Sequence, residues 1–316
     1  VGNVSLYHWA TPAYLKKHYI ITIFNRSRII KKQYTWSYCN QNIEILMENI
    51  NIKKILDYFK SGKFEIAKKE TTLLIKKFPN NYFLYNLFGA ILAGQKKLDE
   101  AVIYFEKSIQ ISPNYADSYN NLAGVLADQK KYDKAIEYFQ KAIQINPKLP
   151  EAYHNLGKAL AEVERYDEAI NNYNQAIKIK PNYVKAYDNL GNVYRILNDF
   201  ENAISCYEKT IEIDGSYSDT YNKLAILYCD IGRVDDARKC FQKLFKLKPD
   251  NVQYKINNAL LLTPVYKSVE EIDLYRNKFI EGLDLLKKCK YSTDQPANKI
   301  ELNFYYLAYH NKDNLE

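Results

Sequence analysis

The sequence predicts an all-α fold, a right-handed superhelical solenoid made of about six helix-turn-helix repeats, with capping helices at its C-terminal end. Three residue types recur with a period of 34 residues or a multiple of it. The first is a proline, at Pro79, Pro113, Pro147, Pro181 and Pro249. The second is an invariant alanine, at Ala67, Ala101, Ala135, Ala169, Ala203 and Ala237. The third is a small residue that follows a tyrosine four positions earlier, at Gly89, Ala123, Gly157, Gly191 and Ala225.

The first 46 residues do not match this period. They contain both tryptophans, and their six lysines and arginines face the single acid Glu44. The only methionine of the chain, Met47, stands one residue before the first repeat. Three interpretations remain open for residues 1–46: upstream sequence that does not belong to the protein, a basic transit peptide, or a small real element. We expect this leader to pack poorly against the repeats, so that its deletion leaves the melting temperature nearly unchanged.

Each repeat is predicted to consist of two antiparallel helices. With the proline at position 32, position 1 falls on Glu48, Tyr82, Ala116, Pro150, Val184 and Ser218. Small residues at positions 8 and 20 let the two helices approach closely, and an aromatic residue at position 24 fills the space beside them. Proline then ends the second helix, because it lacks an N–H group and clashes with the preceding turn. We expect glycines to serve packing both at position 8 and in the tight turn, as at Gly62 and Gly232.

Two further helices are predicted after the last repeat. Residues 252–262 read as a capping helix that ends before Pro264. The sequence from Ser268 to Glu271 forms a capping box, which indicates that a helix begins there and continues to about Cys289. A polar linker follows, and then the aromatic segment 303–310. We therefore divide the chain into a leader (1–46), a repeat array with its capping helix (47–262) and a junction segment (263–316).

The pattern of Tyr, Gly or Ala, Ala, aromatic and Pro resembles the tetratricopeptide repeat (TPR), and the resemblance covers residues 48–251. It implies that the first helix of every repeat lines a concave groove. Position 6 of the repeats then forms a ladder along this groove: Asn121, Asn155, Asn189, Lys223 and Asn257. An asparagine amide both donates and accepts hydrogen bonds, and can therefore pair with a peptide backbone. We predict that these residues, with His154 at position 5, hold an extended polypeptide; ordinary consensus sequence is the alternative explanation.

Composition and motifs exclude several other functions. The net charge of +8 is concentrated in the leader, so the array is nearly neutral and does not look like a nucleic-acid binder. No apolar run is long enough to span a membrane. The five cysteines fit no zinc pattern, and no phosphate-binding loop, HExxH or GxSxG motif is present. We therefore predict no catalytic residue, metal, cofactor or small-molecule ligand for this chain, and a cytoplasmic location.

The segment after the repeats resembles the junction of SPINDLY-like bacterial protein O-GlcNAc transferases. The similar residues run from Thr263 to Ile272 and from Phe304 to Tyr309. The resemblance implies a parent enzyme that transfers N-acetylglucosamine from UDP-GlcNAc to protein Ser or Thr hydroxyls, with the repeats presenting the acceptor. The two nucleotide-sugar-binding lobes of that family have no counterpart here, so the chain alone is expected to be inactive. The alternative is an independent TPR adaptor that joins other proteins.

Overall fold

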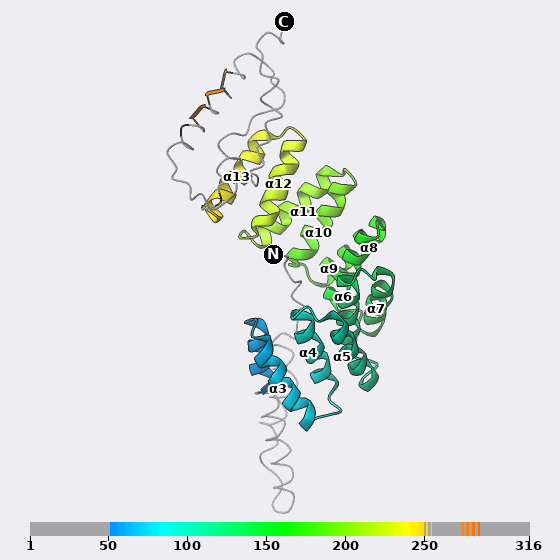
Figure 1. The fold of residues 1–316 in the computed structure, drawn as a ribbon. Helices are drawn as coiled ribbons and strands as arrows, with labels where there is room; N and C mark the ends of the chain where they lie inside the picture. The colour runs from blue at the N-terminus through cyan, green and yellow to red at the C-terminus, as the bar shows by residue number, and fades with distance from the viewer. Residues whose placement is uncertain are drawn as a thin grey trace, which may run out of the picture. The chain divides into compact units, whose positions relative to one another are not determined.

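The computed structural model describes residues 51–249 and isolated residues between 251 and 284. All regular structure in this part is helical (Figure 1). Residues 51–60 are helical, and α3 (Phe64–Lys77) completes their repeat. The first helices of the later repeats are α4 (Tyr82–Gly94), α6 (Ala116–Asp128), α8 (Pro150–Glu162), α10 (Val184–Ile196) and α12 (Ser218–Asp230). The second helices are α5 (Leu98–Ile111), α7 (Tyr132–Ile145), α9 (Tyr166–Ile179), α11 (Phe200–Ile213) and α13 (Val234–Leu247).

The helix starts confirm the predicted register. Helices α4, α6, α8, α10 and α12 begin at the residues to which the sequence assigned position 1. Every second helix ends two residues before position 32, where proline or Gly215 stands. The predicted leader and junction segment, and the capping helix at 252–262, lie outside the described residues except for isolated positions.

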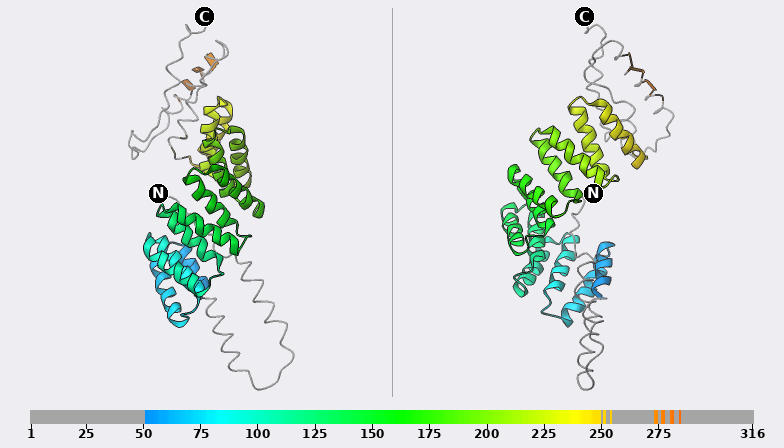
Figure 2. Two further views of the ribbon diagram at one scale, coloured as in Figure 1. Left: turned by 90° about the vertical axis from the view of Figure 1, so that its right-hand side faces the viewer. Right: turned by 180° about the vertical axis from the view of Figure 1, so that it is seen from behind.

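The described helices fall into two compact units that divide between Lys180 and Pro181. Unit 1 contains α3 to α9, and unit 2 contains α10 to α13. Within each unit the two helices of a repeat pack against each other, and each second helix also contacts the first helix of the next repeat (Figures 1 and 2). This division falls within residues 47–262, which the sequence analysis assigned to a single repeat array.

Close approach of the two helices explains the small residues at position 8. A Cβ atom added to Gly89 would lie 2.9 Å from the Phe105 ring, and one added to Gly157 would lie 2.9 Å from the Tyr173 ring. The invariant alanines at position 20 are all fully buried. Packing of this kind stabilises the repeat only when the ring at position 24 is itself enclosed. This condition is met, because the side chains of Phe105 and Tyr173 are 0% and 1% exposed.

The turn glycines have a different role from the one that the sequence predicted. A Cβ atom added to Gly62 or Gly232 would meet nothing within 4 Å, so packing does not require glycine there. Both residues have a positive φ, of 72° and 77°. Lys96, Lys130, Glu164 and Asn198 occupy the same turn position in the other repeats, with φ between 59° and 63°. Glycine is therefore favoured at this position by backbone conformation, because other L-residues adopt it at a cost.

Gly232→Ala should consequently lower the free energy of unfolding by about 1 kcal/mol, because the new Cβ is strained at positive φ. Gly215→Ala is the matched control in the same unit. Gly215 has no positive φ, and its added Cβ would meet only Ile211 O at 3.7 Å. Urea denaturation of both variants measures the difference. Equal destabilisation by the two substitutions would show that φ is not the cause.

Candidate protein-binding face

In unit 1 the first helices form a continuous face. Helix α4 contacts α6, and α6 contacts α8, whereas the second helices of neighbouring repeats have fewer contacts with each other. The first helices are therefore closer together than the second helices. We call the surface that α4, α6 and α8 form the inner face of unit 1. It corresponds to the side on which the sequence places the asparagine ladder.

The asparagines at position 6 of unit 1 hydrogen-bond to the preceding repeat. Asn121 Nδ2 donates to Asn86 Oδ1 at 3.0 Å. Asn155 Nδ2 donates to Asn120 Oδ1 at 3.1 Å. Both acceptors occupy position 5 of the repeat before. Asn121 is only 3% exposed, while Asn155 is half-buried, so a ligand can reach Asn155 more easily.

His154 also belongs to this network. The sequence placed it in the groove as a polar residue, but its side chain is only 4% exposed. Its Nδ1 lies 3.2 Å from Asn155 Oδ1, and its ring lies 5.9 Å from the Tyr173 ring. Both contacts hold the ring inside the repeat. His154 therefore orients Asn155 and adds little exposed surface of its own.

In unit 2 an ion pair joins the same two positions, position 6 of one repeat and position 5 of the repeat before it. Lys223 Nζ lies 2.6 Å from Asp188 Oδ2, and Thr220 Oγ1 donates to Asp188 Oδ1 at 2.6 Å. The Asp188 side chain is 8% exposed and that of Lys223 is 30% exposed, so the cation is largely committed to this pair. Asn189 is half-buried, and its Oδ1 accepts from Asn192 Nδ2 at 3.4 Å. Asn257, the last predicted ladder residue, lies outside the described residues.

The sequence prediction missed the acceptors at position 5. The five repeats that begin at Tyr82 and later each carry a polar residue there: Asn86, Asn120, His154, Asp188 and Asn222. The first four of these are buried. A polar residue at each position 5, one turn from the small residue at position 8, was the signal that could have identified them. Buried polar groups need partners, and position 6 of the next repeat supplies the partner for Asn86, Asn120 and Asp188.

A second polar cluster lies at the start of α6. Asp117 and Asn86 lie near the Tyr115 hydroxyl and shift its pKa in opposite directions, Asp117 upward and Asn86 downward. Burial raises the pKa of Tyr115 far above its usual range, and Asp117 adds to this effect. Burial is also the main cause that raises the pKa of Asp117, with a further contribution from the Glu151 carboxylate. Lys180 pairs with Glu151 at 3.4 Å.

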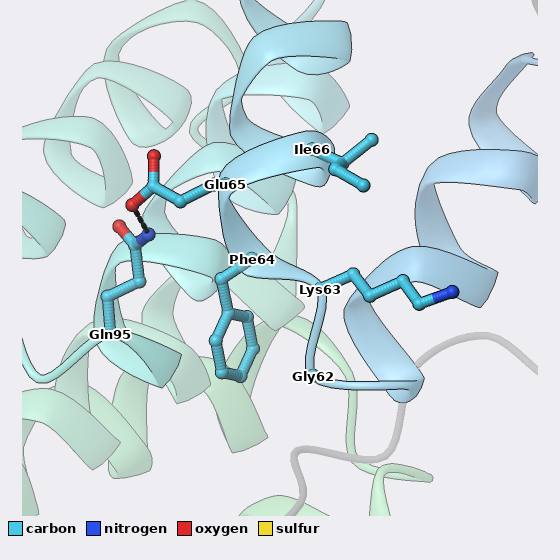
Figure 3. Close-up of a pocket in the computed structure, with 6 residues that line it drawn as sticks. All are labelled: Gly62, Lys63, Phe64, Glu65, Ile66 and Gln95. Atoms are coloured by element: carbon cyan, nitrogen blue, oxygen red, sulfur yellow. Dashed lines mark hydrogen bonds between the residues drawn. The ribbon is translucent and has the colours of Figure 1, made fainter.

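A shallow hollow lies at the other end of unit 1, beside the turn before α3 (Figure 3). Its lining residues are Gly62, Lys63, Phe64, Glu65, Ile66 and Gln95. Gln95 Nε2 donates to Glu65 Oε1 at 2.6 Å, and Gln129 Nε2 donates to Asp99 Oδ1 at 2.9 Å one repeat later. Because the same bond recurs in the next pair of repeats, it connects neighbouring repeats and is not particular to this hollow.

The described residues contain no group of three or more His, Cys, Asp or Glu side chains placed to hold a metal ion. Burial raises the pKa of Cys206 and Cys240 to about 12 and that of Cys229 to about 11, so these thiols stay protonated and unreactive at neutral pH. Among the helices described, none has the length and apolar character that crossing a membrane requires.

Comparison with known families identifies the repeats. A family model described as "Tetratricopeptide repeat" matches residues 83–148, 114–182 and 152–216, and a second model of the same description matches residues 206–239. No curated protein matches the chain.

Several solved structures are similar to the chain. PilW, a widely conserved type IV pilus biogenesis factor, superposes with a TM-score of 0.60 at 18% identity, over 65% of this chain and 96% of PilW. PilF of Pseudomonas aeruginosa gives a TM-score of 0.52 at 20% identity, over 66% of this chain and 93% of PilF. MamA is 28% identical over 51% of this chain and 94% of its own, with a TM-score of 0.48. The described part of this chain is therefore an all-α array of tetratricopeptide repeats.

Proposed function

We propose that the chain is a protein-binding scaffold whose first helices hold an extended polypeptide. The observation that carries the proposal is that each of the two units has an oriented amide at position 6. Asn155 is fixed by Asn120 and His154, and Asn189 is fixed in part by Asn192. Both side chains are half-buried and thus reachable. Amides that are already oriented lose little conformational entropy when a peptide backbone binds to them.

Two uses of such a scaffold remain. In the first, the repeats present acceptor proteins to a glycosyltransferase, as the resemblance of residues 263–316 to SPINDLY-like enzymes suggests. Those residues lie outside the described part except for isolated positions. In the second, the chain is an independent adaptor in the cytoplasm. The coding sequence downstream of Glu316 separates them, because a transferase requires two nucleotide-sugar-binding lobes in the same reading frame.

Asn155→Ala should weaken peptide binding by about tenfold, because it removes a backbone hydrogen-bonding amide from a reachable position. The probe is a peptide selected from a random phage-displayed library, labelled with fluorescein and followed by fluorescence anisotropy. Asn189→Ala should act in the same direction. Asn121→Ala should lower the melting temperature with a smaller effect on affinity, since Asn121 is 3% exposed.

Asn120→Ala is the matched control, because it breaks the same hydrogen bond as Asn155→Ala and leaves the Asn155 amide in place. Both variants should lose similar stability, and only Asn155→Ala should lose most of the affinity. Failure of the library to yield any binding peptide would refute the proposed function. Crosslinks of the bound peptide to second helices alone would refute the inner face as its site.

A further inference from the structure

In unit 2 a chain of hydrogen bonds connects a buried hydroxyl to a residue of the asparagine ladder. Tyr207 occupies position 24, on α11, and its side chain is 0% exposed. Its hydroxyl donates to Asn192 Oδ1 at 2.9 Å, and Asn192 Nδ2 donates to Asn189 Oδ1 at 3.4 Å. Both asparagines are half-buried and lie on α10. The chain therefore runs from the core of the repeat to Asn189 at position 6.

Packing does not require this hydroxyl. Position 24 holds a buried phenylalanine in three other repeats, at Phe105, Phe139 and Phe241. The repeat of Tyr173 has the exposed Lys158 at position 9. In the sequence, only the repeat that contains α10 and α11 combines a tyrosine at position 24 with an asparagine at position 9. Because a buried hydroxyl is costly without a hydrogen-bond partner, the two residues belong together, and their pairing serves something other than packing.

The Tyr207 ring is held firmly enough to orient its partner. A Cβ atom added to Gly191 would lie 2.7 Å from the ring, so the ring packs directly on the backbone of α10. Burial raises the pKa of the hydroxyl to about 12, which keeps it protonated and able to donate at neutral pH. A donor at this place fixes the Asn192 amide, since its oxygen faces the hydroxyl and its NH2 group faces the other side. Tyr207 thus decides which end of the Asn192 amide meets Asn189.

We propose that Tyr207 and Asn192 are positioning residues, which hold Asn189 so that its NH2 group donates to a backbone carbonyl oxygen of the bound polypeptide. Asn192 engages the Oδ1 atom of Asn189, and the NH2 group lies on the other side of that amide. An NH2 group has two N–H bonds, so it can donate to the ligand and keep another hydrogen bond. The inference rests on the proposed function. It adds the ligand group that Asn189 recognises and the buried residue that prepares it.

The test uses the fluorescein-labelled, library-selected peptide whose affinity falls most in Asn189→Ala. Tyr207→Phe keeps the ring and should weaken binding of this peptide about three- to fivefold, since the peptide must then order the amide itself. Tyr207 is fully buried and cannot touch the peptide, so the loss is transmitted through Asn192. Asn192→Ala should act in the same direction. Asn189→Asp keeps the acceptor for Asn192 but loses both N–H donors, and it should weaken binding at least about tenfold.

Tyr228→Phe is the matched control in the same unit. The Tyr228 side chain is 4% exposed, and its hydroxyl donates to Glu208 Oε1 at 2.8 Å, not to an amide of α10. This variant should lose at least as much melting temperature as Tyr207→Phe, because the lost hydrogen bond goes to a charged group. Its affinity for the peptide should equal that of the wild type.

A double-mutant cycle gives a readout that a merely structural role would not move. In the Asn189→Ala background, Tyr207→Phe should have no further effect on affinity, because the amide that it positions is gone. The inference is overturned by wild-type affinity in Tyr207→Phe, by an effect that persists in Asn189→Ala, by tight binding to Asn189→Asp, or by selected peptides that are all indifferent to Asn189→Ala. Each of these results leaves the selected peptides as evidence for the proposed function. If the library yields no binding peptide, the proposed function itself fails.

Discussion

Phe105→Ala should lower the free energy of unfolding by about 3–5 kcal/mol, the largest loss that we expect from a single substitution. The Phe105 side chain is 0% exposed, and its ring packs directly on the backbone of Gly89. Alanine would leave a cavity between α4 and α5 that neither helix can fill, since their contact is already fixed by small residues. Urea denaturation followed by far-UV circular dichroism measures the loss.

Ile103→Ala is the control on the same helix, because Ile103 is 61% exposed. Its effect should stay within about 0.5 kcal/mol. A repeat array can unfold in more than one step, so the comparison uses the full denaturation curves of both variants. A loss at Phe105 no larger than the loss at Ile103 would contradict the role of position 24 as the centre of each repeat.

Lys223→Asn should lower the free energy of unfolding by about 2 kcal/mol. It removes the cation that lies 2.6 Å from Asp188 and leaves a nearly buried carboxylate that still accepts a hydrogen bond from Thr220. Breaking a fully buried pair from one side costs about 3–5 kcal/mol, and the 30% exposure of Lys223 reduces the expected value. Chemical denaturation at low salt is the appropriate measurement.

The chain itself supplies the matched control for this pair. In unit 1 the same two repeat positions hold Asn86 with Asn121 and Asn120 with Asn155. The double variant Asp188→Asn, Lys223→Asn copies that neutral connection into unit 2, and it should recover most of the stability that Lys223→Asn loses. A double variant as unstable as the single one would show that the buried charge is not the cause.

Much of the fold could be predicted because the repeat period is a local property. Proline stops a helix wherever it stands, and a small residue at position 8 is needed wherever two helices touch. The starts of α4, α6, α8, α10 and α12 therefore follow from counting. The turn glycines were interpreted wrongly, because sequence alone does not separate a glycine required by packing from one favoured by positive φ. Gly89 belongs to the first kind and Gly232 to the second.

The candidate site was predicted less completely. Sequence placed Asn121, Asn155, Asn189 and Lys223 in one register, but it could not assign their partners. The donor at position 6 and its acceptor at position 5 of the preceding repeat are 35 residues apart in the chain. Which polar group bonds to which depends on how the repeats stack. Peptide binding by these residues stays a prediction that the affinity measurements must test.

The sequence by itself determined the helical class, the repeat period and the boundaries of the helices, because these depend on contacts within one repeat and on the residues that begin or end a helix. Only the tertiary structure decided which polar side chains are free to bind a ligand. Stacking buries His154 and commits Lys223 to Asp188, while it leaves Asn155 half-buried and within reach of a ligand. The physical reason is that burial and hydrogen-bond partners are properties of neighbouring repeats, which the order of residues within a single repeat does not specify.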